Sequence, residues 1–204
     1  MARMRFLTIL LFPICFFRLV SIDYIEFARQ SIFTNGRILS VFFVPDDKVK
    51  NILLGLINNE KKYIFTAQYR LNDKDVVQAL IEAHKRGVRL YIIVDSSALE
   101  DRFHKVKIVH AEGIPVHVYT GYTIMHNKFF IFGQNFEHKA ITWTGSANVT
   151  YAGLARNQEN VFITESQFVI EKYKNKFTTL WNQTTPFQEI KMPVIINPEY
   201  KMAI

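Results

Sequence analysis

Apolar positions follow two different periods along the chain from residue 38 onward. Short, nearly continuous apolar runs indicate strands, and the segments between them carry apolar residues three and four apart, as on one face of a helix. The expected strands are 38–44, 63–68, 88–94, 114–119, 128–132, 140–144 and 159–163. The expected helices are 46–59, 72–86, 101–112, 150–155 and 166–181. This alternation predicts an α/β fold, with a mixed, mainly parallel β-sheet and helices on both faces.

The N-terminus shows a third pattern, in which Arg3 and Arg5 precede an apolar run at 6–17. The run is too short for a comfortable membrane span and suits the core of a signal peptide, although the small residues of a cleavage site are missing. We expect residues 1–30 to be a signal peptide or an uncleaved membrane anchor. The protein would then be exported, to the periplasm or the medium, or anchored to a membrane. A buried first helix is the alternative, and Pro13 in mid-run weighs against it.

The rest of the chain fits one domain followed by a tail. Its 204 residues, 49% of them hydrophobic, are enough for one sizeable core and too few for two. We expect this domain to span residues 36–185. Residues 186–204 contain Pro193 and Pro198, which favours a tail that lies over the surface.

Composition narrows the partners and the chemistry. The formal net charge of +7 and the pI near 9.4 favour a polyanionic partner, either nucleic acid or an anionic membrane surface. A soluble surface that is merely basic is the alternative. The single cysteine, Cys15, excludes an intrachain disulfide framework and a metal cluster held by thiolates.

Polar residues gather at the ends of three expected strands. His126 and Lys128 begin one strand, Ser146 and Asn148 follow the next, and Glu159 begins a third. Residues two apart on a strand share a face, so His126 and Lys128 are expected to project together. Each short pattern alone matches by accident, but all of them in order at strand ends indicate a site.

This set of side chains suits phosphoryl transfer without a metal or another cofactor. Lys128, Ser146 and Asn148 can donate hydrogen bonds to the non-bridging oxygens of a substrate phosphate. Glu159 can accept from one ring nitrogen of His126, which leaves the other nitrogen free to attack phosphorus. We therefore expect His126, Lys128 and Glu159 to be catalytic. The alternative is a capped turn, made by Ser146 and Asn148, beside an ordinary carboxylate.

The order of these segments resembles the signature of the phospholipase D superfamily, which is H-x-K-x-x-x-x-D, then G-S-x-N, then a segment like N-x-E-N. Here the segments read H-N-K at 126–128, G-S-A-N at 145–148 and N-Q-E-N at 157–160. The resemblance covers most of 38–181 and is nearest to short members with one copy of the motif, namely small bacterial endonucleases, mitochondrial cardiolipin hydrolase and its piRNA-pathway relatives. It implies a phospholipase D-like fold and a phosphohistidine on His126 that water resolves. It also implies that the lysine, serine and asparagine bind phosphate and that the glutamate orients the histidine.

The sequence departs from the family pattern at Gly133, where the signature has aspartate. We take that aspartate as a supporting residue, for which Asn135 and Glu137 in the same turn could partly substitute. A second H-x-K segment is also missing. The resemblance therefore implies a homodimer with the active site at the two-fold interface, where the second His126 supplies the general acid.

The resemblance leaves more than one substrate class open. An endonuclease on DNA or RNA is the first choice, because a short single-motif chain and a basic surface fit a nucleic-acid groove. A phospholipase D or cardiolipin hydrolase acting on phospholipids is the alternative, supported by the hydrophobic N-terminus. The third possibility is a non-catalytic binding module that keeps the fold after losing the aspartate.

Overall fold

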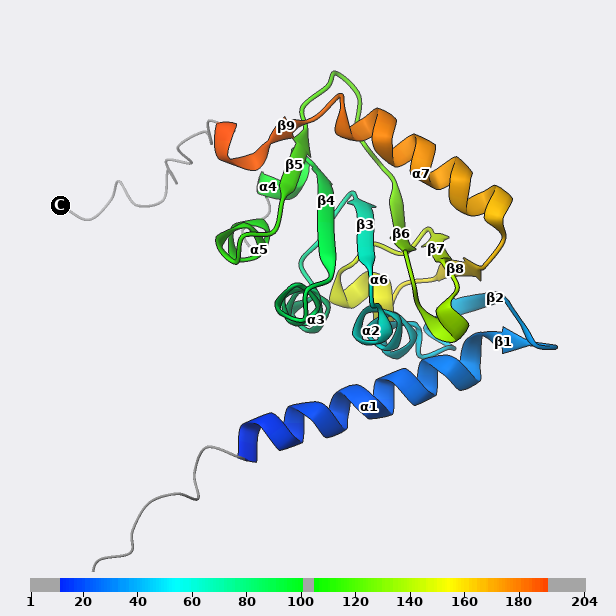
Figure 1. The fold of residues 1–204 in the computed structure, drawn as a ribbon. Helices are drawn as coiled ribbons and strands as arrows, with labels where there is room; N and C mark the ends of the chain where they lie inside the picture. The colour runs from blue at the N-terminus through cyan, green and yellow to red at the C-terminus, as the bar shows by residue number, and fades with distance from the viewer. Residues whose placement is uncertain (1–11, 101–104, 191–204) are drawn as a thin grey trace, which may run out of the picture.

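The computed structural model describes residues 12–100 and 105–190, in which one open sheet carries helices on both faces (Figure 1). The strands are β1 (Phe33–Thr34), β2 (Arg37–Val44), β3 (Tyr63–Gln68), β4 (Arg89–Asp95), β5 (Val116–Tyr119), β6 (Lys128–Phe132), β7 (Ile141–Gly145), β8 (Glu159–Thr164) and β9 (Thr185–Pro186). The α-helices are α1 (Phe12–Ile32), α2 (Val49–Asn59), α3 (Lys74–Lys85), α4 (Ser97–Glu100), α5 (Val106–Ala111), α6 (Tyr151–Ala155) and α7 (Gln167–Trp181), and the 3₁₀ turns are η1 (Phe136–His138) and η2 (Phe187–Glu189). The strand order is β1-β2-β8-β7-β6-β3-β4-β5-β9.

The sheet is mixed, as expected, but antiparallel pairs predominate in it. β3 pairs with β4, and β4 with β5, in parallel. The other six pairings between described strands are antiparallel. The expectation of a mainly parallel sheet is therefore wrong. α3 and the segment with α4 and α5 connect neighbouring parallel strands, and α2 likewise connects β2 to β3, which run in the same direction. The connections from β6 to β7 and from β7 to β8 reverse the chain.

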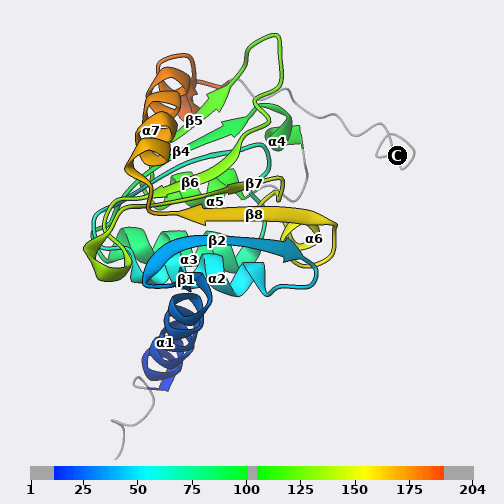
Figure 2. The same cartoon turned by 90° about the vertical axis from the view of Figure 1, so that its right-hand side faces the viewer.

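Helices cover the two faces of the sheet unequally (Figures 1 and 2). The larger core lies on the face of α2 and α3 and includes Phe130 and Trp143 from neighbouring strands. On the other face α7 packs against β3, β6 and β7. Phe129 and Ile131 meet Phe177 of α7 there in a second, smaller core. The prediction of helices on both faces is confirmed.

The C-terminal part of α1 packs against α2 as part of the domain. Ala28 and Ile32 are fully buried. A Cβ atom on Gly55 would overlap the carbonyl oxygen of Tyr24 and the side chain of Ala28, so glycine permits this close approach of the two helices. The expected boundary at residue 30 falls within α1.

Three expectations fall wholly or partly outside the described residues. These residues, 1–11, 101–104 and 191–204, hold part of the expected signal peptide or anchor, the start of an expected helix and most of the expected tail. The described start of that tail is paired, because Thr185–Pro186 joins β5 as the strand β9. Within the described residues, no helix has the length and apolar character needed to cross a membrane.

Candidate active site

The polar segments singled out in the sequence meet at one end of the sheet. β6 begins at Lys128, β7 ends at Gly145 and β8 begins at Glu159, and antiparallel pairing places these strand ends side by side. The C-terminal ends of β3 and β4 lie at the same end, because Gln68 of β3 pairs with Lys128. Figure 2 shows this end at the right, where β2 finishes and β8 begins. We call it the catalytic edge.

Ser146 and Glu159 are joined directly across β7 and β8. The hydroxyl of Ser146 donates to Oε2 of Glu159 at 2.5 Å and accepts from the backbone N–H of Asn160 at 3.0 Å. The other carboxylate oxygen accepts from Nδ2 of Asn157 at 3.3 Å. A Cβ on Gly145 would overlap the carbonyl of Asn160, so glycine is needed where the two strands approach. The hydroxyl and the carboxylate are therefore held in one fixed pair.

Lys128 supplies a buried cation at the catalytic edge. Its side chain is only 5% exposed, and its Nζ donates to the carbonyl of His126 at 2.8 Å. Burial lowers the pKa of the Lys128 ammonium from its ordinary value of 10.5, and the charge of Glu159 acts in the opposite direction. The ion pairs among the described residues do not include Lys128. Its charge therefore remains available to a phosphate.

His126 lies immediately before β6 and is exposed. Its ring centroid is 4.5 Å from that of Tyr69, at an interplanar angle of 58°. β6 begins only at Lys128, and the common projection of His126 and Lys128 stays a prediction. Within the described part of the chain, Glu159 bonds to Ser146 and Asn157 and not to His126. Orientation of His126 by Glu159 stays a prediction.

Asn148 adds an amide with unused hydrogen-bonding capacity. Its Oδ1 is buried and has no hydrogen-bond partner among the described residues. The cap of α6 is Thr150, whose hydroxyl accepts from the N–H of Gly153 at 3.0 Å. Ser146 and Asn148 therefore do not cap α6, although the Ser146 hydroxyl accepts from the backbone N–H of Asn160. The Oδ1 atom of Asn148 accepts hydrogen bonds, so only the Nδ2 group of the same amide can serve a phosphate.

Gly133 lies at the opposite end of β6 from the site. Position 133 is five residues from Lys128, which corresponds to roughly 16 Å along a strand. Its N–H donates to the carbonyl of Tyr63 at 2.9 Å, and a Cβ there would come within 2.5 Å of the Tyr63 ring. The departure from the family pattern therefore lies away from Lys128, Ser146 and Asn148.

The carboxylate of Glu60 occupies the neighbourhood of Gly133. Glu60 is 1% exposed, and its Oε1 accepts from the N–H groups of Lys62, Tyr63 and Gln134 at 2.8, 3.1 and 2.8 Å. Its Oε2 accepts from Nδ2 of Asn135 at 3.1 Å. Glu60 thereby ties the turn after β6 to the start of β3.

The expected substitutes for the missing aspartate lie in the same turn. Asn135 takes part in the Glu60 network, whereas Glu137 pairs with Lys139 at 3.0 Å. Both residues follow the far end of β6 and are separated from His126 by the length of that strand. Their position fits a structural role.

Two side chains at the catalytic edge were not predicted from the sequence. Tyr69 follows β3 and contacts His126. Asp95 ends β4, and its buried carboxylate accepts from the N–H of Met125 at 2.7 Å and that of Ser97 at 3.0 Å. Asp95 thus ties the segment before His126 to the sheet. The tendency of ligands to bind at the carboxyl ends of parallel strands is the signal that could have identified both residues.

The donor set suits an anion. Lys128, Ser146 and Asn148 offer an ammonium, a hydroxyl and an amide, whereas hard metal ions prefer carboxylate and carbonyl oxygens. The described residues contain no group of three or more His, Cys, Asp or Glu side chains that could hold a metal ion. Independence from metal ions stays a prediction.

Known proteins share much of this sequence. The family model described as "Cardiolipin synthase, PLD-like domain" matches residues 53–181. The "Phospholipase D" of Rickettsia typhi is 33% identical over 137 residues, which are 67% of this chain and 65% of that protein. The "Mitochondrial cardiolipin hydrolase" of Danio rerio is 27% identical over 119 residues, which are 58% of this chain and 50% of that protein. This chain therefore spans about two thirds or less of the length of these relatives.

Solved structures share the fold. Nuc from Salmonella typhimurium, described as a phospholipase D family member, matches with a TM-score of 0.66 and 25% identity over 73% of this chain and 97% of Nuc. NucT from Helicobacter pylori matches with a TM-score of 0.66. At 22% identity, this likeness shows a shared fold and nothing more. The range matched by the family model contains every candidate site residue, and the resemblance seen in the sequence is confirmed. The chain belongs to the phospholipase D superfamily.

Proposed function

We propose that the protein is a metal-independent phosphodiesterase that acts through a phosphohistidine intermediate on His126. The observation that carries this proposal is the meeting of Lys128, Ser146, Asn148 and Glu159 at the catalytic edge beside the exposed imidazole of His126. The Lys128 ammonium and the Nδ2 group of Asn148 can donate to the non-bridging oxygens of a phosphodiester, and the Ser146 hydroxyl can do so when its proton turns from Glu159 to the substrate.

The reaction has two steps. A ring nitrogen of His126 attacks phosphorus, and the bond from phosphorus to the leaving oxygen breaks as that oxygen takes a proton from a general acid. Water then attacks the phosphohistidine, its proton passes to the same acid–base group, and the phosphorus–nitrogen bond breaks to release a phosphomonoester. Lys128, Ser146 and Asn148 hold the charge on the non-bridging oxygens in both steps.

The general acid is supplied by a second copy of the chain in this proposal. Among the described histidines, only His126 lies at the catalytic edge, since the others sit at the ends of helices, within β5 or in the turn before β7. Two copies related by a two-fold axis would bring two His126 side chains to one site, where one attacks and the other donates the proton.

An uncovered apolar face of the sheet supports the homodimer. Leu39, Val41 and Phe43 of β2 are 55%, 54% and 54% exposed. Of the residues that alternate with them, Ile38 and Val44 belong to the larger core and Phe42 packs against it. Leu39, Val41 and Phe43 therefore point to the face of α7, which packs against β3, β6 and β7. Phe43 pairs with Asn160, so this face adjoins the catalytic edge. We assign it to contact with the second subunit.

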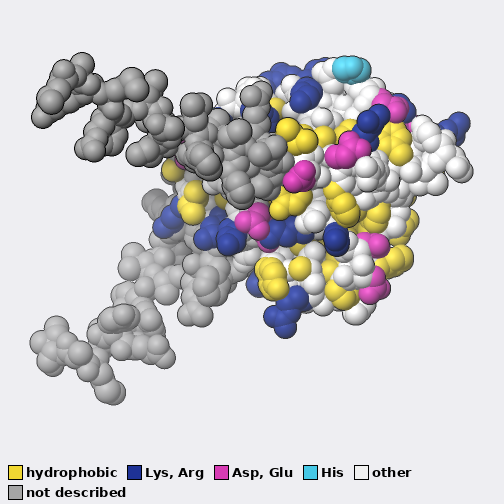
Figure 3. Space-filling model, turned by 90° about the horizontal axis from the view of Figure 1, so that it is seen from below, with side chains coloured by type: hydrophobic (Ala, Val, Ile, Leu, Met, Phe, Trp, Pro, Cys, Tyr) yellow, Lys and Arg dark blue, Asp and Glu magenta, His cyan; other side chains and the backbone are white. Residues whose placement is uncertain are grey.

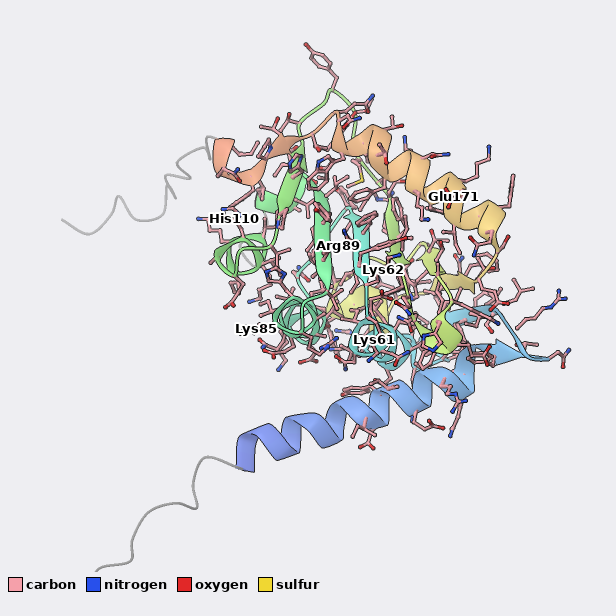
Figure 4. All side chains as sticks on the ribbon, viewed as in Figure 1. Lys61, Lys62, Lys85, Arg89, His110 and Glu171 are labelled. Atoms are coloured by element: carbon pink, nitrogen blue, oxygen red, sulfur yellow. The ribbon has the colours of Figure 1, made fainter. Side chains whose placement is uncertain are left out.

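Nucleic acid, DNA or RNA, is the substrate class that we propose first. The net charge of +7 favours it, and this chain contains a counterpart of nearly the whole Nuc chain. Lys61, Lys62 and Arg89, labelled in Figure 4, lie at the starts of β3 and β4, at the opposite end of the sheet from the catalytic edge. Figure 3 shows Lys and Arg side chains among acidic and apolar ones on the face seen from below. Because these basic side chains lie away from the catalytic edge, the net positive charge favours nucleic-acid binding through long-range electrostatic attraction.

Phospholipid is the second candidate class, and one feature beside the site favours it. Tyr122 is fully exposed and Ile124 is 63% exposed, and both lie in the segment that leads to His126. An aromatic and an aliphatic side chain in this position suit contact with a membrane surface. The relatives named phospholipase D and cardiolipin hydrolase point in the same direction. In this case residues 1–30 would anchor the domain to the membrane or direct its export.

A side-by-side turnover assay tests the proposed function. Purified protein is offered single-stranded DNA, RNA, phosphatidylcholine and cardiolipin, with and without a chelator, and His126→Ala is the control. We expect turnover of nucleic acid that survives the chelator and disappears in His126→Ala. Salt-sensitive DNA binding without turnover of any substrate would indicate a non-catalytic module. Turnover that His126→Ala retains would overturn the mechanism.

A further inference from the structure

We infer that Tyr69 is a positioning residue that holds the imidazole of His126 in the orientation needed for attack on phosphorus. This inference rests on the proposed function and concerns a side chain outside the family signature. It follows from where the Tyr69 ring lies relative to both chemical groups of the H-N-K segment.

The ring of Tyr69 contacts both of those groups. Its centroid lies 4.5 Å from the centroid of the His126 ring, which is a close distance for an aromatic pair. The ammonium of Lys128 lies 5.3 Å from the same centroid, within the range of a cation–π contact. Tyr69 is therefore the described side chain that links the proposed nucleophile to the proposed phosphate-binding cation.

The backbone fixes Tyr69 in this place. The N–H of Tyr69 donates to the carbonyl of Asn127 at 2.9 Å, which extends the pairing of β3 with β6 by one residue past Gln68. The ring is half-buried, and the guanidinium of Arg70 lies 5.5 Å from its centroid. A side chain held by the sheet and packed by neighbours can act as a fixed support.

His126 needs such a support. It is exposed and lies before the strand, and Tyr69 is the described residue whose side chain contacts its ring. An exposed histidine samples several rotamers, whereas attack in line with the leaving oxygen requires one of them. The ring of Tyr69 blocks part of this freedom. The ring alone provides this support, so phenylalanine should replace tyrosine without loss of activity.

The test compares Tyr69→Leu, which removes the ring, with Tyr69→Phe, which keeps it. We expect Tyr69→Leu to lower kcat about tenfold or more while KM changes by less than about threefold, because the phosphate donors remain. Tyr69→Phe should keep kcat within about twofold of the wild type. The matched control is Tyr91→Leu, since Tyr91 packs against Phe65 and Trp181 at centroid distances of 5.4 and 5.3 Å and not against His126. It should keep kcat even if it lowers thermal stability.

A spectroscopic readout decides the role of Tyr69 without reference to turnover. NMR relaxation of the His126 ring in histidine-labelled protein, assigned with His126→Ala, reports how mobile the imidazole is. We expect a more mobile ring in Tyr69→Leu and an unchanged one in Tyr69→Phe and Tyr91→Leu. Equal mobility in all these variants would overturn the inference, as would a Tyr69→Phe enzyme as slow as Tyr69→Leu. An inactive wild type would overturn the proposed function, whereas the NMR comparison would still decide the inference about Tyr69.

Discussion

Gly133→Asp, which restores the family aspartate, should destabilise this protein and should not activate it. The new Cβ would lie 2.5 Å from Cδ1 and Cε1 of Tyr63, whose ring is stacked on Phe65 at a centroid distance of 4.4 Å. Overpacking of this kind costs about 2 kcal/mol of the free energy of unfolding. A second carboxylate close to the buried Glu60 adds a cost of the same sign. The site lies at the other end of β6, so kcat of the folded protein should stay within about twofold of the wild type.

Urea unfolding and turnover of the same samples measure the two effects. A loss of about 2 kcal/mol moves the unfolding midpoint by about 1 M urea. Gly133→Ala is the control that adds the Cβ without the charge, and it should show most of the loss. Tyr63→Leu in the Gly133→Asp background removes the ring, and the pair should couple by about 1 kcal/mol or more in a double-mutant cycle. A Gly133→Asp protein that is as stable as the wild type and several times more active would refute this reasoning.

Further predictions concern the Glu60 network, the dimer, the buried cation and metal ions. Glu60→Gln should lower the free energy of unfolding by about 2 kcal/mol, because the new amide faces Nδ2 of Asn135; equal stability in chemical denaturation would contradict the network. Val41→Asp should give a monomer of low activity in sedimentation, whereas an active monomer would exclude the shared site. Burial lowers the pKa of Lys128 below 10.5. KM should therefore rise as the pH increases towards that lowered pKa, because the ammonium loses its charge. Lys128→Arg should move this rise in KM to higher pH. A chelator should leave turnover unchanged, and recovery by added metal after its loss would contradict the mechanism.

Local patterns predicted the elements that position the site. β3 and β6 have the bounds expected from their apolar runs, Tyr63–Gln68 and Lys128–Phe132. Strand ends that carry Ser146 and Glu159 were expected to meet, and the pair is joined by a hydrogen bond of 2.5 Å. These successes rest on short-range information, because a buried strand and the polar residues at its ends are contiguous in the sequence.

Features that depend on pairing between distant strands were not predicted. The strand direction was misjudged because a helix between two strands suggests a parallel crossover, whereas the loop with α6 reverses the chain. The helices expected at 46–59 and 72–86 begin later, at Val49 and Lys74, since Asp47 bonds to the N–H of Phe43 and Asp73 caps α3. The roles of Glu60 and Tyr69 follow from contacts with residues more than fifty positions away, which no local pattern contains.

Trapping of the covalent intermediate tests directly whether His126 is the nucleophile. The protein is mixed with a turned-over substrate, quenched in alkali, where phosphohistidine survives, and digested for mass spectrometry. We expect an adduct on the peptide that contains His126, in which phosphorus keeps the ester group that did not leave. It should form and disappear at rates that match turnover and be absent in His126→Ala. Turnover by the wild type with no adduct on His126, or with the adduct on another residue, would contradict this role of His126.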